Sequence, residues 1–328
     1  MTDKTLCGDV PGERHLKGFS LIELMISLSI GLLILIASLS AYQGASKASK
    51  LAEAQVRMNE DAQAALGMLT QQLRMAGYNP IQVGRTDASR HNPVYGPKTY
   101  ATGSDFALRG CDGPFSNVTT AARIDDLRCE VGARGSIAVS YEADLFNTVP
   151  TAGRPTDCLG FNLDPITTTF PAEEPSAPDT TAVYYVADNR FYIANAAPRA
   201  TPSLYCKGNG EDSVALPLVE NVEDMQFTYG AAADSNDVKT APVAGYLSAQ
   251  AIGQLAPQLT TVPADAERWG KVISVRVCVL VRSDAPVLAD SASAQYYNCA
   301  NPSTRVSAPD LRLRRAYFTT VVLRNRRL

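Results

Sequence analysis

A single carboxylate interrupts a long apolar run near the start of the chain. Within Phe19–Leu39 the only charged residue is Glu23, and the run is long enough to span a bilayer as a helix. A charge inside such a span is costly, so it usually has a function and needs a partner of opposite charge. A basic segment containing Arg14 and Lys17, followed by Gly18, precedes the run, and this order of features is typical of a processing site.

The stretch Gly18-Phe19-Ser20-Leu21-Ile22-Glu23-Leu24-Met25 resembles the type III signal of type IV pilins and their relatives. In that family a membrane aspartyl peptidase cuts after the glycine and methylates the new amine. The resemblance therefore implies cleavage between Gly18 and Phe19 and N-methylation of Phe19. Glu23 would face the N-terminal amine of a neighbouring subunit, which supplies the opposite charge that a buried carboxylate needs. Ser40 stands where many major pilins carry a helix-kinking proline, so the resemblance leaves the kink open.

The composition bounds what the chain can be. Its 328 residues are enough for one large or two small domains beyond the anchor, and the net charge is −3. A mildly acidic chain of this kind is not expected to bind nucleic acid over a large surface. Major pilins are usually much shorter, so by resemblance the length suggests a less abundant, specialised subunit.

Cysteine usage indicates an oxidising compartment. Cys7 lies in the expected cytoplasmic leader peptide, residues 1–18, and the other six of the seven cysteines follow the apolar helix. An even number beyond the helix fits disulfides in the periplasm of a bacterium, with the N-terminus in the cytoplasm. Several pairings are open, as are buried free thiols, and the absence of CxxC spacing argues against zinc. We expect nearest-neighbour pairing: Cys111–Cys129, Cys158–Cys206 and Cys278–Cys299.

Helical signals continue past the apolar run. Leu51, Met58, Ala62, Leu66, Leu69 and Leu73 recur at spacings that place them on one helix face. Gly77 followed by Tyr78-Asn79-Pro80 is a stop signal. We expect a helix over 19–78, with 19–39 spanning the membrane and the second half packing against the rest of its own chain.

The remainder is predicted to be an α+β head domain. Residues 79–180 are rich in glycine and proline, which predicts an irregular, disulfide-containing insertion with a few strands, including Ser136–Tyr141. Residues 181–328 are predicted to form an antiparallel sheet that packs on the helix, with a hairpin turn at Asp188-Asn189. In Lys271–Val281 one face is wholly aliphatic, namely Ile273, Val275, Val277, Val279 and Val281, and it is expected to cover the leucine-rich helix face.

Little in the sequence suggests an enzyme, a metal site or a cofactor site. The chain has two histidines, His15 in the leader and His91 in a polar loop, and no G-x-S-x-G or phosphate-binding glycine loop. Asp234-Ser235-Asn236-Asp237 partly resembles a calcium loop, but the turn glycine and closing glutamate are missing, so a simple turn is favoured. The C-terminal arginines could bind DNA or an acidic partner, or form a solvated strand end: Arg312, Arg314, Arg315, Arg324, Arg326 and Arg327.

Three further segments resemble the PilW type of minor pilin. They are Arg74–Tyr78, Leu218–Met225, and the stretch from Trp269 through the strand Val272–Val281, followed by the arginine-rich final strand. The resemblance implies a pilin-like fold and a minor pilin that primes type IV pilus assembly and supports twitching motility. It would be cut by a prepilin peptidase, sit in the inner membrane with a periplasmic head, and then reach the pilus tip.

By the same resemblance, its partners would be other minor pilins, the major pilin through the N-terminal helix, and a tip adhesin. Two other functions remain open, namely a minor pseudopilin of type II secretion and a pilin for DNA uptake. The tip subunit of type II secretion commonly lacks the glutamate, so Glu23 argues against that one member only. No cofactor and no catalytic residue are expected.

Overall fold

The computed structural model describes residues 18–80, 92–95, 107–170, 179–198, 200–233, 241–259 and 263–325. The chain divides into two units, Met1–Leu51 and Ala52–Leu328. Helix α1 (Leu21–Met75) begins in the first unit and ends in the second. Its observed bounds lie within the predicted range, and the helix is not interrupted at Ser40. The leader, including Cys7 and His15, lies outside the described residues.

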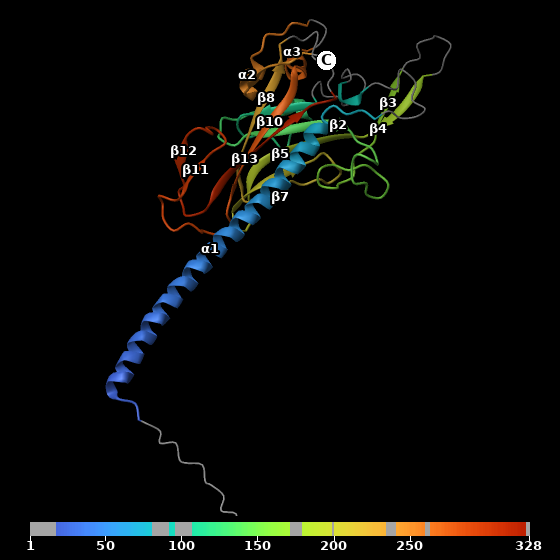
Figure 1. Ribbon diagram of the computed structural model, residues 1–328. Helices are drawn as coiled ribbons and strands as arrows, with labels where there is room; N and C mark the ends of the chain where they lie inside the picture. Colours follow the sequence, from blue (N-terminus) through green and yellow to red (C-terminus); the bar gives the residue numbers. More distant parts are fainter. Residues whose placement is uncertain are drawn as a thin grey trace, which may run out of the picture. The chain divides into compact units, whose positions relative to one another are not determined.

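The second unit is built mainly from two antiparallel sheets (Figure 1). The five-stranded sheet has the order β1-β2-β5-β6-β7 and the four-stranded sheet the order β13-β10-β8-β9. Their bounds are β1 (Leu108–Cys111), β2 (Ser136–Glu142), β5 (Val186–Ala196), β6 (Thr201–Lys207), β7 (Leu216–Glu220), β8 (Val222–Ala232), β9 (Val243–Leu247), β10 (Val272–Arg282) and β13 (Arg314–Val322).

Two ribbons and several short helices complete the head. β3 (Ile166–Phe170) pairs with β4 (Thr180–Tyr184), and β11 (Gln295–Tyr297) pairs with β12 (Arg305–Ser307). The helical elements are α2 (Ala249–Gly253), α3 (Ala264–Gly270) and the 3₁₀ turns η2 (Pro93–Tyr95) and η3 (Ile124–Asp126). Together with the long apolar helix, these antiparallel sheets make an α+β, pilin-like architecture.

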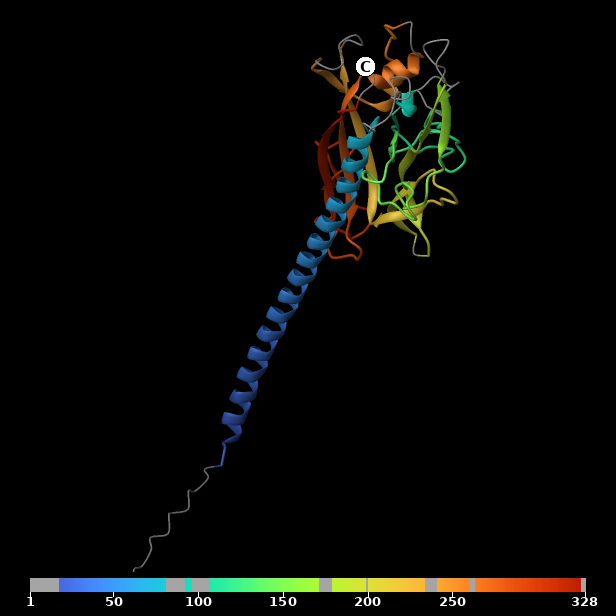
Figure 2. The same cartoon turned by 90° about the vertical axis from the view of Figure 1, so that its right-hand side faces the viewer.

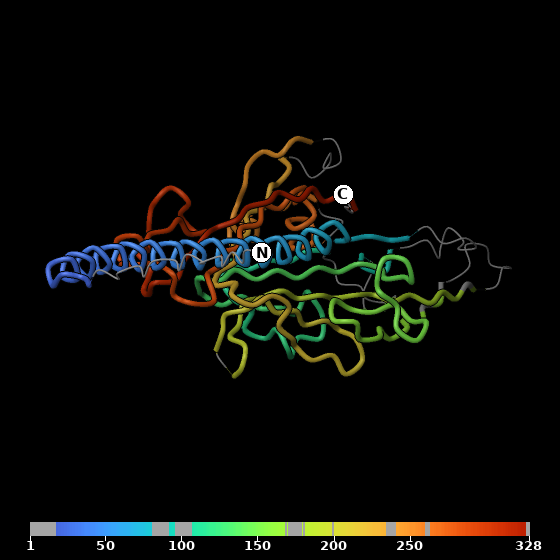
Figure 3. Tube along the Cα trace, turned by 60° about the horizontal axis from the view of Figure 1, so that its bottom comes forward, coloured from blue at the N-terminus to red at the C-terminus, as the bar shows by residue number. Residues whose placement is uncertain are grey.

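The second half of α1 lies along the seam between the two sheets (Figures 2 and 3). Its buried residues are Met58, Ala62, Ala65, Leu69 and Leu73, which follow the helical period because one face of the helix meets the core. The predicted stripe is therefore confirmed at Met58, Ala62, Leu69 and Leu73, while Leu51 and Leu66 are only partly buried. Complete burial of a leucine side chain stabilises the fold by roughly 1.5–3 kcal/mol.

The faces of β10 follow the predicted alternation with one exception. Val275, Val277, Val279 and Val281 are fully buried in the same core as the helix stripe. The register of β10 against β8 shifts between Val272 and Ser274, and this bulge turns Val272 toward the core in place of Ile273. Period-two alternation cannot anticipate a bulge, so the prediction was wrong at Ile273.

The predicted hairpin turn at Asp188-Asn189 is wrong. Strand β5 runs without a break through both residues, and β4 ends before it. Both side chains are buried and have polar partners inside the head: Asp188 pairs with Arg190, and Asn189 bonds to Gln72. Residues that favour turns in solvent are here satisfied by the core, which removes the reason for a turn.

The end of α1 is closed by residues from distant parts of the head. Gly77 has a φ of +72°, and a Cβ there would collide with the Asn325 carbonyl oxygen and the Tyr95 hydroxyl. The Asn325 amide donates to the Arg74 carbonyl at 2.9 Å, which satisfies one of the carbonyls left open at a helix end. The predicted stop signal therefore ends the helix at a glycine in the left-handed conformation. The residues that pack around this glycine come from distant parts of the folded head.

Candidate functional site

The candidate cleavage and assembly site begins directly before α1. Gly18, Phe19 and Ser20 are not helical, and Phe19 is 84% exposed. Ser20 and Glu23 form a capping box: the Ser20 N–H donates to Glu23 Oε2 at 3.0 Å, and the Glu23 N–H donates to Ser20 Oγ at 3.2 Å. The predicted cleavage bond between Gly18 and Phe19 thus lies in an exposed segment just outside the first turn.

The capping box positions the carboxylate of Glu23. It holds that carboxylate in the first turn of α1, three residues after Ser20, where the helix dipole favours negative charge. After cleavage, the amine of Phe19 would be the neighbour of Ser20 along the chain. A carboxylate placed there can meet an amine at the helix start. Sequence reasoning missed the part played by Ser20, although the spacing Ser-x-x-Glu signals it.

The apolar part of α1 satisfies its polar side chains within the helix. Four serine hydroxyls each donate to the carbonyl four residues earlier: Ser27 to Glu23, Ser29 to Met25, Ser38 to Ile34, and Ser40 to Ile36. Such bonds keep hydroxyls satisfied where no water is at hand. By length and composition this helix can cross a membrane, and its apolar segment is exposed throughout.

Three disulfides join the six cysteines beyond the helix. They are Cys111–Cys129, Cys158–Cys206 and Cys278–Cys299, which are the nearest-neighbour pairs, with Cα–Cα distances of 5.4, 6.6 and 5.7 Å. Cys278 lies on the face of β10 away from the helix and packs with Leu280 and Cys299 in a small separate cluster. This bond ties the segment between β11 and β12 to the central strand of the four-stranded sheet.

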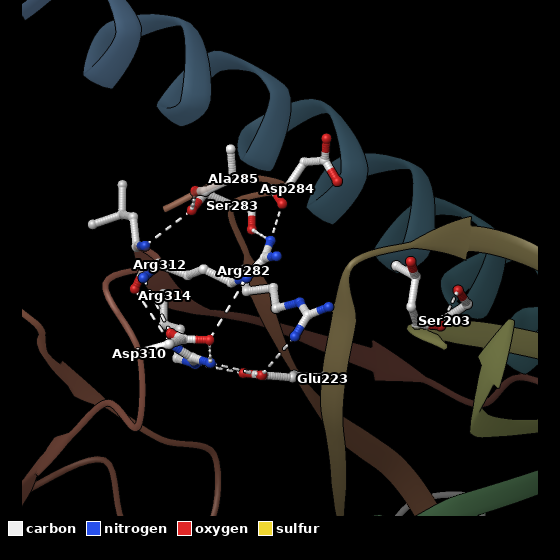
Figure 4. Close-up of polar contacts among 11 residues, drawn as sticks. Ser203, Glu223, Arg282, Ser283, Asp284, Ala285, Asp310, Arg312 and Arg314 are labelled. Carbon is white, nitrogen blue, oxygen red and sulfur yellow. Dashed lines mark hydrogen bonds and ion pairs between the residues drawn. The ribbon is translucent and has the colours of Figure 1, made fainter. Parts of the chain in front are cut away.

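The C-terminal arginines have very different surroundings. Arg314 has a side chain only 2% exposed, and it forms paired hydrogen bonds with Glu223, at 2.6 and 2.8 Å, and with Asp310, at 2.6 and 3.3 Å (Figure 4). Arg312 donates to the carbonyls of Ser283 and Asp284. These two arginines are therefore part of the internal structure of the head and do not form a basic surface.

Electrostatics within this cluster follow from the same contacts. Hydrogen bonds from Arg314 hold the pKa of Asp310 below its usual range. Burial opposes the charge of Arg314, but its hydrogen bonds to Glu223 and Asp310 outweigh burial and raise its pKa. Arg315 and Arg324 remain exposed, whereas Arg326 and Arg327 lie outside the described residues.

A second set of polar contacts joins the helix to both sheets. The Asn189 amide donates to Gln72 on α1 at 2.8 Å and to the Tyr141 hydroxyl at 3.3 Å. Burial raises the pKa of Tyr141 to about 12, so this hydroxyl keeps its proton at any physiological pH. On the other sheet, the Tyr317 hydroxyl donates to Asn59 at 2.6 Å. Nothing in the periodicity of the sequence indicates these long-range pairs.

The described residues offer few sites for other chemistry. Among them, no group of three or more His, Cys, Asp or Glu side chains could hold a metal ion. His91 and the calcium-like segment 234–237 lie outside the described residues. The arrangement that remains is a candidate processing site, a membrane-length helix and a disulfide-bonded head.

Comparison with known proteins gives two matches to protein families. Residues 183–325 match the family described as Type IV Pilus-assembly protein W, and residues 14–39 match the Prokaryotic N-terminal methylation motif. No curated protein and no solved structure matches the chain significantly. The two family matches cover the head from β4 to β13 and the segment from the basic leader to the end of the apolar run.

Proposed function

Since this chain matches a PilW-type pilin with an N-terminal cleavage and methylation signal, we propose that it is a minor pilin that primes assembly of a type IV pilus. It would then form part of the tip complex together with other minor pilins and a tip adhesin. The observation that carries this proposal is the capping box of Ser20 and Glu23 at the start of a 55-residue helix whose second half is built into a disulfide-bonded head.

The prepilin motif implies processing by a prepilin peptidase and interaction with other pilins. Cleavage after Gly18 would expose the amine of Phe19 for methylation. Glu23 would then pair with the amine of a neighbouring subunit, because an unpaired carboxylate at this depth in the bilayer is strongly disfavoured. That pairing would recruit each new subunit and set its register in the filament.

The location follows from the same features. An apolar N-terminal helix and a prepilin motif fit a pilin anchored in the inner membrane. We propose that the head lies in the periplasm, since three disulfides are most stable in an oxidising compartment. After assembly, the head would stand at the pilus tip.

Two alternatives differ in their support. The hypothesis of DNA uptake depends on the C-terminal arginines. Two of them, Arg312 and Arg314, donate hydrogen bonds to carbonyls and carboxylates of their own chain. They are therefore unavailable to phosphate, which weakens that hypothesis. A minor pseudopilin of type II secretion would use the same anchor and the same kind of head, so it remains the competing assignment.

Deletion of the gene for this chain in its host distinguishes a minor pilin from a type II secretion pseudopilin and from a DNA-uptake pilin. We would count surface pili by electron microscopy and assay secreted enzymes in the same cultures. The proposal expects pili to be lost or rare while secretion is normal. Normal pili with blocked secretion would assign the chain to type II secretion, and normal pili with reduced DNA uptake would assign it to uptake. Complementation with the intact gene is the control.

A further inference from the structure

Strand β13 is an edge strand with an open side. Among the described residues it pairs with β10 along one edge and with no strand along the other. The pairing runs from Arg282–Arg314 to Ser274–Val322 without a shift in register. From Ala316 to Leu323 the edge carries no charge, no proline and no glycine. Such a strand offers unpaired backbone groups to any other extended chain, and natural proteins usually protect an edge of this kind.

The other edges of the two main sheets are protected. β1 is four residues long and contains Gly110, and β7 contains Pro217 beside a shift in its register with β6. β9 contains Gly245 and meets β8 across another shift. Within the described part of the head, β13 is the one main-sheet edge that is both long and regular. The fold thus disrupts three edges and leaves a fourth intact, which suggests that the fourth is used.

The outer face of β13 is also apolar where the edge is open. Phe318 is 57% exposed and Val322 is 59% exposed, and the two alternate with the exposed Thr320. Toward the start of the strand, Ala316 is covered, because it packs with Tyr296 of β11 around the Cys278–Cys299 disulfide. Figure 2 places β13, in red, at the margin of the head. An incoming strand would therefore find both backbone partners and apolar side chains between Phe318 and Val322.

Charge at the two ends of this stretch selects the partner. Arg315 and Arg324 are exposed and form no ion pair with the described residues, unlike Arg314. Arg315 and Arg324 are nine positions apart, so the alternation of the strand directs them to opposite faces, but each end of an antiparallel pair of two copies would still carry Arg315 of one copy and Arg324 of the other. Parallel pairing in register would place each arginine beside its own counterpart. Both arrangements gather positive charges at the ends of the pair, and no carboxylate between Ala316 and Leu323 balances them, so self-pairing is disfavoured in both directions.

We propose that the open edge of β13, from Phe318 to Val322, binds an extended strand of a different protein. That strand would carry acidic residues at its two ends, opposite Arg315 and Arg324, and apolar side chains facing Phe318 and Val322. Backbone hydrogen bonds would provide affinity, and the charged ends would set the register. The inference rests on the proposed function only for where the partner is met, at the tip of a filament.

Photo-crosslinking in the host tests the proposal with a matched pair of sites. Thr320 on β13 and Thr228 on β8 are both exposed and both lie opposite Arg276 of β10, one on each side. A benzophenone amino acid would replace each in turn in the full-length chain, and adducts would be mapped by mass spectrometry. We expect adducts from position 320 to exceed those from position 228 by about tenfold or more, because only the edge strand meets the partner.

The mapped segment and a charge reversal decide the outcome. The proposal expects the position 320 adducts to fall on one segment of another protein, with acidic residues flanking apolar ones. Arg324→Glu should reduce that adduct by about fivefold or more. The same substitution should raise adducts between two copies, because the introduced carboxylate of each copy would then lie at the same end of the pair as Arg315 of the other.

Three results would each overturn the proposal. They are equal amounts of adduct at positions 320 and 228, adducts formed mainly between two copies of this chain without the Arg324→Glu substitution, and an amount of adduct at position 320 that Arg324→Glu does not change. Pili counted in the deletion strain test the proposed function separately. Loss of pili in that strain with no adduct at position 320 refutes only the strand docking. Normal pili with a clear adduct at position 320 refute only the pilus assignment.

Discussion

The side-chain amide of Asn189 on β5 donates to Oε1 of Gln72 on α1 across 2.8 Å. Asn189 is fully buried, and its side-chain oxygen Oδ1 accepts a hydrogen bond from the backbone N–H of Cys158. One side chain therefore joins the helix, the sheet and a disulfide-bonded loop. Buried amides of this kind are costly to leave half-satisfied, because their lost hydration is not replaced. The helix is thereby fixed at one position along the sheet.

Replacement of Asn189 should destabilise the head more than replacement of Gln72. Asn189→Ala removes three contacts and leaves the Cys158 N–H without its acceptor, so the free energy of unfolding should fall by about 2–3 kcal/mol. Gln72→Ala should cost about 1 kcal/mol. Thermal unfolding of the full-length chain in detergent measures both. If the double variant loses the full sum of the single effects, the two side chains are not coupled and the account is wrong.

Glu23→Val should leave cleavage largely intact while impairing assembly. The predicted cleavage bond lies in an exposed segment outside the helix, whereas the proposed assembly step needs the carboxylate to meet an amine. Cleavage is measured by the size of the chain on gels, and assembly by counting pili and by the amount of this chain in sheared filaments. Glu53→Val is the matched control, since Glu53 is an exposed carboxylate on the same helix that pairs only with Arg57 among the described residues. Normal assembly of the Glu23→Val chain would refute the charge-pairing account.

Arg314→Leu should destabilise the head, and the effect should depend on pH. Its removal leaves Glu223 partly buried with only Arg282 nearby, at 3.5 Å, so we expect a loss of about 2–3 kcal/mol at neutral pH. Arg315→Leu, at the exposed neighbour, should change the free energy of unfolding by less than about 0.5 kcal/mol. Chemical denaturation of the full-length variants measures both, and equal effects would show that burial of Arg314 does not matter.

The pH dependence has a definite sign. Hydrogen bonds from Arg314 lower the pKa of Asp310 in the folded chain, so this carboxylate contributes stability above its unfolded pKa and loses it as the pH falls through the folded pKa. The difference in stability between the natural chain and Arg314→Leu should therefore be constant near neutral pH and narrow below about pH 4. A difference that widens in acid would contradict this assignment.

Thiol labelling should separate precursor from mature chain. With Cys111–Cys129, Cys158–Cys206 and Cys278–Cys299 bonded, Cys7 is the one remaining cysteine, and it lies in the predicted leader. Denatured, unreduced precursor should take up one equivalent of a thiol reagent, and mature chain should take up none. Reduced samples of each serve as the control. Labelling of mature, unreduced chain would show that at least one of these disulfides is absent in the cell.

The sequence anticipated the features that depend on local periodicity. The helix stripe from Met58 to Leu73 and the aliphatic face of β10 both follow from regular spacing, which is enough when one face of an element meets a core. The predicted strand Ser136–Tyr141 corresponds to β2, which is buried along its whole length. The glycine at position 77 marked the end of α1 because few other residues tolerate a left-handed conformation.

Features that depend on distant partners could not be anticipated. Asp188 and Asn189 favoured a turn because nothing local indicates that Arg190, Gln72 and Tyr141 will satisfy them. Arg314 was grouped with a basic tail because its partner Glu223 comes 91 residues earlier. In each case the polar residue favours one local structure when it is in solvent and another when it has partners inside the head. Most of those partners are far away in the sequence, so only the assembled sheets bring them together.

The contact between Asn325 and Arg74 also has a consequence for synthesis. The helix leaves the ribosome before the head does, and the residue that closes its end follows 251 residues after Arg74. Until β13 and Asn325 arrive, the stripe from Met58 to Leu73 lacks part of its covering, and the Tyr317 hydroxyl has not reached Asn59. A chain released early would keep a complete membrane anchor attached to an unfinished head. Translation through Asn325 is therefore a condition for a complete head, and chains that stop short of it would expose part of the stripe from Met58 to Leu73 to proteases.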